Sequence, residues 1–308
     1  MKTIFTLTCL FFILSVTGQQ FMEKEVEMEK LNGTLSIPDA KTHTAILLIA
    51  GSGPTDRNGN NALGFMNNSL KMVAQELSKA GYAVLRTDKR GIAASKGAVE
   101  DQTNLRFEHF VEDAKNWLNF LNQEGYKKLI IAGHSQGSLV GMIAAQDNER
   151  VVGFISIAGL AEDAGEAIVR QLGAQSPVLA EDARVNIDSM KAGYTVKKFN
   201  PYLVSIFGPA IQPFLKSYIS YSPTEEIKKL DIPILIINGT TDIQIEVSQA
   251  NSLKKACPNA DLLIIDAMNH VLKDAPADPA ANMATYNNPE LPLSDGLITG
   301  MITFIKKL

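Results

Sequence analysis

The sequence predicts an α/β protein with a mostly parallel central sheet flanked by helices. Short, continuous apolar runs recur along the chain, as expected of strands that are buried on both faces. Segments with helical periodicity alternate with these runs, and several of them end at a glycine or a proline. A third observation is a helical insertion of about sixty residues, near 160–222, which is far longer than an ordinary loop.

The predicted elements begin with a hairpin. A leading hairpin is expected from 25–28 and 34–37, around Asn32-Gly33. The runs that predict further strands are 45–50, 83–85, 129–132, 151–157, 232–237 and 262–265. The patterns that predict helices are 69–80, 108–121, 139–145, 246–256 and a C-terminal segment within 292–307 that begins near Ser294.

The insertion near 160–222 is expected to form a helical cap. It contains two helical stretches, 162–172 and 179–190, followed by a segment rich in proline and aromatic residues. Such a cap would cover the carboxyl edge of the sheet, where open α/β folds bind their ligands. Its aromatic side chains are therefore candidates for a substrate pocket, with simple packing of the cap as the alternative: Tyr202, Phe207, Phe214 and Tyr218.

The amino-acid composition is that of a globular protein. The chain has 308 residues, of which 45% are hydrophobic and 20% charged, with a net charge of -4, so it is globular rather than disordered or coiled-coil. No basic stripe is present, which argues against a nucleic-acid partner. Two cysteines cannot build a disulfide framework.

The N-terminus is typical of a signal peptide. Lys2 precedes an apolar run, 4–16, and small residues follow up to Gly18. We expect residues 1–18 to be removed on export to the periplasm or the medium, leaving 19–308 as one domain that is not inserted in the membrane. The alternative is an anchor helix that is kept.

The segment Gly133-His134-Ser135-Gln136-Gly137 predicts a nucleophilic serine. It lies between an apolar run and a helical pattern, and glycines two residues on either side allow a sharp strand-to-helix turn that exposes the serine hydroxyl. The N–H groups of the helix that follows would face a developing anion.

A serine nucleophile needs a base, and the chain has four histidines. His270 follows the run 262–265 by a short loop, which puts it at the same sheet edge as Ser135. For His43 and His109 a surface or packing role is the simpler interpretation, and the side chain of His134 should point away from the serine.

The acid that orients the base is expected to be Asp242, which follows the run 232–237 at the same edge. It completes the chain order Ser, Asp, His that this type of turn predicts. Asp266 and Asp274 are nearer to His270 in sequence and remain alternatives.

Oxyanion donors are expected at two backbone N–H groups: Gln136, directly after the nucleophile, and Ser52 in the glycine-rich loop after the run 45–50. Gly53 is the second choice in this loop and lets the backbone approach a substrate. A phosphate-binding loop is the alternative, but the spacing of a dinucleotide motif is missing.

The segments AGSGPTDR (50–57), DKRG (88–91), GHSQG (133–137), NGTTD (238–242) and NH (269–270) occur in this order. Together they resemble the α/β-hydrolase-fold serine esterases, and more narrowly the bacterial EstD-like carboxylesterase group, which is related to the serine aminopeptidase-type hydrolases. The resemblance implies an α/β-hydrolase fold, hydrolysis of carboxylic esters with short to medium acyl chains, and the triad Ser135, Asp242 and His270. It also implies that DKRG is a structural loop.

The expected partner is therefore a small-molecule ester, and no cofactor or metal is expected. A peptidase or a thioesterase could use the same triad, because a fold alone does not exclude either. A non-catalytic binding protein on this fold would usually have lost a triad residue, and none is missing here.

Overall fold

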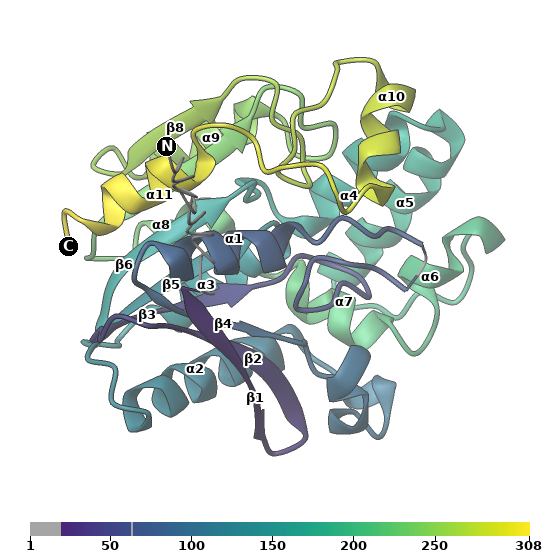
Figure 1. Ribbon diagram of the computed structural model, residues 1–308. Helices are drawn as coiled ribbons and strands as arrows, with labels where there is room; N and C mark the ends of the chain where they lie inside the picture. The colour runs from purple at the N-terminus through teal and green to yellow at the C-terminus, as the bar shows by residue number, and fades with distance from the viewer. Residues whose placement is uncertain (1–19, 63) are drawn as a thin grey trace, which may run out of the picture.

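The computed structural model describes residues 20–62 and 64–308 (Figure 1). The predicted signal peptide, 1–18, lies outside these described residues. An eight-stranded sheet with the order β1-β2-β4-β3-β5-β6-β7-β8 forms the centre of the molecule. Its strands are β1 (Phe21–Met28), β2 (Leu31–Pro38), β3 (Thr44–Ile49), β4 (Ala83–Thr87), β5 (Lys128–His134), β6 (Val151–Ile157), β7 (Ile234–Gly239) and β8 (Asp261–Ile265).

The sheet is parallel from β4 to β8 and antiparallel at the β1–β2 edge. The strands predicted from apolar runs are all present, with bounds shifted by a few residues. Because β3, β5, β7 and β8 run in the same direction, the loops that follow them meet at one edge of the sheet. These loops carry Ser52, Ser135, Asp242 and His270.

The leading hairpin exists, but its turn is not where the sequence predicted it. Glu29 and Lys30 form the turn, with φ angles of 49° and 69°, while Asn32 and Gly33 lie inside β2. A Cβ atom at Gly33 would lie 3.1 Å from the carbonyl oxygen of Arg86. A glycine is therefore needed here because β2 and β4 approach each other closely, and not because the chain turns.

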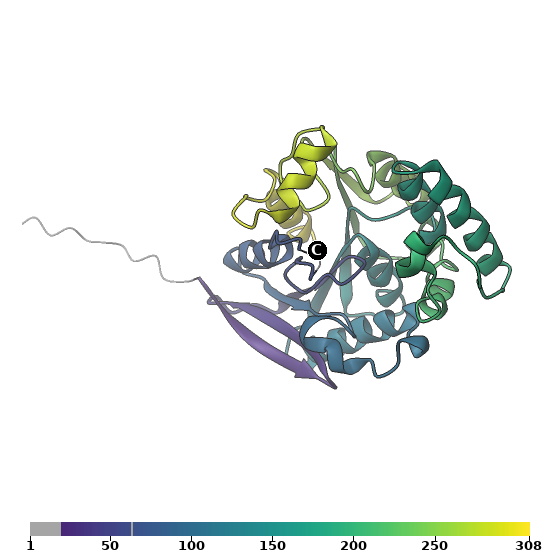
Figure 2. The same cartoon turned by 90° about the vertical axis from the view of Figure 1, so that its right-hand side faces the viewer.

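Helices cover both faces of the sheet (Figures 1 and 2). Side chains of α2 and α3 belong to one apolar core, and those of α1 and α11 belong to a second core on the opposite face. The last helix begins at Leu297 rather than near Ser294, after Gly296 with a φ of 87°. The helices outside the insertion are α1 (Ser69–Lys79), α2 (Phe107–Gln123), α3 (Gln136–Ala144), α9 (Val247–Ala256), α10 (Pro279–Ala284) and α11 (Leu297–Ile305), with 3-10 turns at Ala93–Ala98, Gln102–Asn104 and Thr285–Asn287. A further 3-10 turn, Pro201–Leu203, lies within the insertion.

The chain between β6 and β7 is helical, as predicted, and contains no strand. In Figure 2 these helices gather on the side of the sheet away from β1 and β2. They are α4 (Ala164–Gly173), α5 (Pro177–Lys191), α6 (Val204–Phe207), α7 (Gln212–Tyr218) and α8 (Pro223–Ile227). Across 20–62 and 64–308, no helix has the length and the apolar character that a membrane crossing needs.

Candidate active site

Ser135 stands at the turn between β5 and α3, and its backbone is strained. Its φ is 54° and its ψ is -121°, a conformation that residues other than glycine rarely adopt. The N–H of Ser135 donates to the carbonyl oxygen of Ile157 at 2.9 Å, which ties the turn to the neighbouring strand. Strain of this kind persists only where the surrounding structure fixes it, and it occurs preferentially at functional sites.

The two glycines that flank the turn are required by close backbone approach. A Cβ atom at Gly133 would lie 2.2 Å from the carbonyl oxygen of Gly137. A Cβ atom at Gly137 would lie 2.4 Å from the carbonyl oxygen of Ile49. The sharp strand-to-helix turn predicted from the sequence is therefore present.

His270 and Asp242 are joined by a hydrogen bond. His270 Nδ1 lies 2.8 Å from Asp242 Oδ2, and both side chains are buried. The other carboxylate oxygen of Asp242 accepts from the backbone N–H groups of Gln244 and Ile245, each at 2.8 Å. These contacts fix the carboxylate, which in turn fixes the orientation of the imidazole.

The alternative acids and bases lie elsewhere. Asp266 is exposed and accepts from Thr240 Oγ1 at 3.0 Å, and Asp274 is also exposed. His43 is exposed as well. His109 accepts from the backbone N–H of Arg106 at 3.2 Å and so caps the start of α2. None of these side chains contacts His270 by a hydrogen bond.

His134 makes a contact that sequence reasoning missed. Its Nε2 lies 2.9 Å from the backbone carbonyl oxygen of His270, and the two imidazole rings are 4.8 Å apart. Because a carbonyl oxygen only accepts, Nε2 must carry the proton. Burial lowers the pKa of His134 to about 3, so the ring stays neutral, and its Nδ1 has no partner within the described chain.

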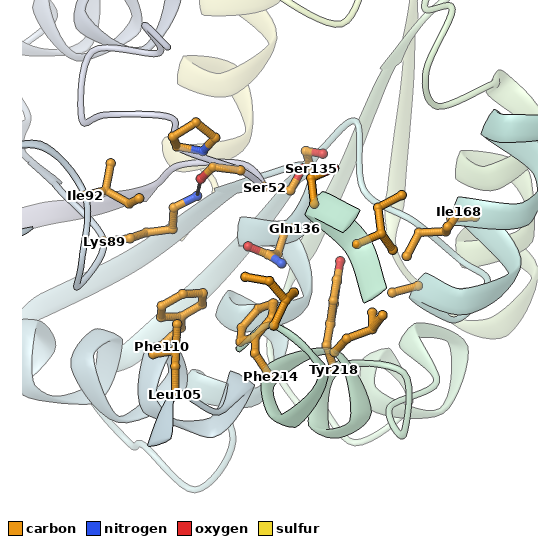
Figure 3. Close-up of a pocket in the computed structure, with 18 of the residues that line it drawn as sticks. Ser52, Lys89, Ile92, Leu105, Phe110, Ser135, Gln136, Ile168, Phe214 and Tyr218 are labelled. Atoms are coloured by element: carbon orange, nitrogen blue, oxygen red, sulfur yellow. Dashed lines mark hydrogen bonds between the residues drawn. The ribbon is translucent and has the colours of Figure 1, made fainter. Parts of the chain in front are cut away.

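A mainly apolar cavity of about 450 Å³ opens in front of Ser135 (Figure 3). Its volume lies within the ~300–1,000 Å³ typical of small-molecule sites. Gly53, Phe214 and Tyr218, three of the residues proposed from the sequence for a substrate pocket, line it. The Tyr218 hydroxyl is close to the side chain of Gln136, and burial raises the pKa of this tyrosine well above its usual range.

Two predicted pocket residues do not line this cavity. Tyr202 is 86% exposed. Phe207 is fully buried and packs 6.2 Å from the ring of Phe199, away from the cavity. Both residues lie in a tightly turned segment of α6 and the preceding 3-10 turn, where spacing alone does not reveal the direction of a side chain.

A second cavity of about 240 Å³ also borders Ser135. His270, Gln244 and Tyr286 are among its lining residues, and the Gln244 side chain donates to the Tyr286 hydroxyl at 3.2 Å. Ser135 lines both cavities. No hydrogen bond joins Ser135 to His270 in this structure, although both side chains border the second cavity.

The candidate oxyanion donors flank the serine. Ser52 and Gln136 both line the larger cavity, and neither backbone N–H has a hydrogen-bond acceptor among the described residues. Gln136 is the first residue of α3, so its N–H is one of the free donors of the helix N-terminus. In the part of the chain that the structure describes, no three His, Cys, Asp or Glu side chains are placed to hold a metal ion.

The sheet, the flanking helices and the turn at Ser135 define an α/β-hydrolase fold. Residues 66–196 match the model of a family described as "Serine aminopeptidase, S33". This segment contains Ser135 but neither Asp242 nor His270. A search of the curated proteins found no match.

Solved structures agree on the fold. The α/β hydrolase GrgF from Penicillium sp. sh18 superimposes with a TM-score of 0.60 at 16% identity, over 93% of this chain and 98% of that one. An esterase from Pyrococcus furiosus gives a TM-score of 0.57 at 15% identity, over 97% and 95% of the two chains. Est1E from Butyrivibrio proteoclasticus, solved with ferulic acid bound, gives 0.56 at 17% identity, over 90% and 96%.

Proposed function

We propose that this protein is a serine hydrolase that cleaves carboxylic esters with short to medium acyl chains. One observation carries the proposal: the strained Ser135 lines both an apolar cavity and a second cavity bordered by His270, whose imidazole is hydrogen-bonded to Asp242. An ester has an acyl group and an alcohol on either side of the reacting carbonyl. The two cavities provide one space for the acyl group and one for the alcohol. The motif order that resembles the EstD-like carboxylesterases supports the same substrate class.

The proposed reaction follows from the roles of the residues. His270 removes the hydroxyl proton of Ser135, whose oxygen attacks the ester carbonyl. The N–H groups of Ser52 and Gln136 then stabilise the oxyanion. His270 passes its proton to the leaving alcohol, and a water molecule releases the acid from the acyl-enzyme by the same steps.

The test is chemical labelling combined with turnover. We expect a fluorophosphonate probe to label the wild-type protein but not Ser135→Ala, and we expect Ser135→Ala to lose ester hydrolysis while it keeps its circular dichroism spectrum. Substantial ester hydrolysis by a folded Ser135→Ala would contradict the proposal.

A peptidase is the second candidate, because the family model that matches residues 66–196 is described as a serine aminopeptidase. Esterase and peptidase activities are distinguished by measuring kcat/KM for p-nitrophenyl esters of increasing acyl length, for aminoacyl p-nitroanilides and for acyl thioesters. We expect kcat/KM to be highest for esters and to pass through a maximum as the acyl chain lengthens, because the apolar cavity is finite.

A further inference from the structure

The glycine-rich loop that carries Ser52 is held by a lysine from a neighbouring loop. Lys89 follows β4, and its Nζ donates to the carbonyl oxygens of Gly51 and Gly53, the latter at 2.8 Å. Figure 3 shows the Lys89 side chain extending along the cavity wall toward the segment at Ser52. The loop at 88–91, expected from the sequence to be structural, therefore contributes a side chain to the candidate site.

The partners of Lys89 are unusual for a lysine. Two carboxylates of this region are already paired: Asp88 binds Arg57, and Asp113 binds Arg90. Among the described residues, Lys89 has no carboxylate partner. Burial lowers the pKa of Lys89 to about 7, as expected of a cation that is bound by peptide carbonyls rather than by an opposite charge.

Geometry connects the contact at Gly51 to the N–H of Ser52. The peptide bond between them is planar, and the described chain contains no cis peptide. In a trans peptide the C=O of the first residue and the N–H of the second point in opposite directions. The bond from Lys89 to the Gly51 carbonyl therefore sets the direction of the Ser52 N–H.

Glycines give the backbone of this loop more conformational freedom than other residues would. It contains glycines at 51 and 53, and Gly53 has a φ of 67° with nothing within 4 Å of the position that a Cβ atom would take. Gly51 lies directly against the nucleophile, since a Cβ atom there would be 3.1 Å from Ser135 Cβ. A small rotation of the peptide would thus move the Ser52 N–H away from the reacting carbonyl.

We propose that Lys89 is a positioning residue of the oxyanion hole, which orients the Gly51–Ser52 peptide so that the Ser52 N–H faces the oxyanion. The hydrogen bond to the Gly51 carbonyl oxygen also polarises this peptide and makes the N–H a stronger donor. The inference rests on the proposed function, because it assumes that Ser135 forms a tetrahedral intermediate. A donor that is pre-oriented in this way stabilises the transition state more than the bound substrate.

The test compares Lys89→Met with Lys89→Arg and with a matched control, Lys96→Met. Lys96 is exposed, lies in the next turn of the chain and makes no ion pair or hydrogen bond within the described residues. For Lys89→Met we expect kcat for a p-nitrophenyl ester to fall about 100-fold, the cost of losing one oxyanion donor, with KM within about threefold of wild type. Lys89→Arg, which keeps charged donors, should recover at least part of this loss, and Lys96→Met should match wild type.

A second measurement separates positioning from folding and from substrate binding. An alkylboronic acid forms a tetrahedral adduct with a catalytic serine, so its Ki should rise in Lys89→Met by about the same factor as kcat falls. Should Lys89→Met fail to fold, Lys89→Leu, which also lacks a donor, takes its place, with the same expected changes in kcat and Ki.

Three results would overturn the inference. The first is a folded Lys89→Met with kcat within about threefold of wild type. The second is a rise of KM at unchanged kcat, which would make Lys89 a substrate-binding residue. The third is a wild-type protein that neither reacts with fluorophosphonate nor hydrolyses esters. That third result would overturn the proposed function as well, whereas the first two leave it standing.

Discussion

The imidazole of His134 donates a hydrogen bond from Nε2 to the backbone carbonyl oxygen of His270 across 2.9 Å. The donor is the residue directly before Ser135, and the acceptor belongs to the proposed base itself. The loop after β8 is thereby bonded to the turn after β5. The relative position of nucleophile and base thus depends on a contact made by neither of their own side chains.

Replacing His134 with phenylalanine keeps an aromatic ring at this position but removes the donor. We expect kcat for a p-nitrophenyl ester to fall about ten- to hundredfold, because a small displacement of a catalytic group is costly. We also expect the free energy of unfolding to fall by about 1–3 kcal/mol, since the buried carbonyl of His270 loses its partner. Steady-state kinetics and urea unfolding measure the two effects.

His43→Phe is the control for this substitution, because His43 is exposed and far from the site in the fold. It should leave both kcat and the free energy of unfolding near the wild-type values. Equal kcat in His134→Phe and wild type would contradict a positioning role for His134.

The same histidine predicts a pH dependence of stability. The pKa of His134 is about 3 in the folded protein, against 6.5 ordinarily. Between these values the imidazole is protonated in the unfolded chain but not in the folded protein. Stability should therefore fall as the pH drops, by about 3 kcal/mol from this group between pH 7 and pH 4. Measured by urea unfolding, the free energy of unfolding of His134→Phe should fall less steeply with decreasing pH than that of the wild type. Equal pH dependences in the two proteins would show that His134 is not the group responsible.

The sequence predicted the parallel sheet and the turn at Ser135 because both depend on local patterns. Continuous apolar runs indicate strands that are buried on both faces, and glycines at 133 and 137 indicate a turn too tight for side chains. The loops that follow parallel strands meet at one edge, so Asp242 and His270 could be placed near each other from topology alone.

What the sequence could not predict depends on contacts between distant segments. Lys89 binds the carbonyl oxygens of Gly51 and Gly53, and His134 binds that of His270. Backbone carbonyls leave no trace in a sequence motif, since every residue has one. The hairpin turn was misplaced for a related reason: Gly33 is needed for the packing of β2 against β4, and the left-handed turn is made by Glu29 and Lys30 instead.

Asp242→Asn tests the acid of the proposed triad. The amide oxygen can still accept from the N–H groups of Gln244 and Ile245, but the amide nitrogen no longer accepts from His270 Nδ1. We expect kcat to fall about 10³–10⁴-fold, as in a triad whose histidine is held in the wrong tautomer. Asp266→Asn, at the exposed alternative acid, should retain wild-type kcat; the reverse result would assign the acid to Asp266.

A buried ion pair joins the two loops that meet at the oxyanion side of the site. Asp88 Oδ2 lies 2.8 Å from Arg57 Nη2, and both side chains are buried. Asp88→Asn should lower the free energy of unfolding by about 3 kcal/mol, because it leaves a buried guanidinium without its main counter-charge. Glu76→Gln, which breaks the exposed pair with Lys79, should cost less than about 1 kcal/mol in the same urea titration. Similar losses of unfolding free energy in the two variants would show that the buried Arg57–Asp88 pair stabilises the protein no more than an exposed pair does.

Substitution of Phe214 tests which cavity accepts the acyl group. Phe214 projects from α7 into the larger cavity (Figure 3), in contact with the ring of Phe110 at 5.3 Å. Phe214→Ala lengthens this cavity, so kcat/KM should shift toward longer acyl chains by a few carbons, at a cost in stability of about 3 kcal/mol for the lost packing. Tyr202→Ala, at the exposed aromatic residue of the same insertion, should leave the acyl-length profile unchanged. If the profile moved in Tyr202→Ala and not in Phe214→Ala, the acyl chain would have to bind outside the larger cavity, and the smaller cavity beside His270 would become the candidate acyl site.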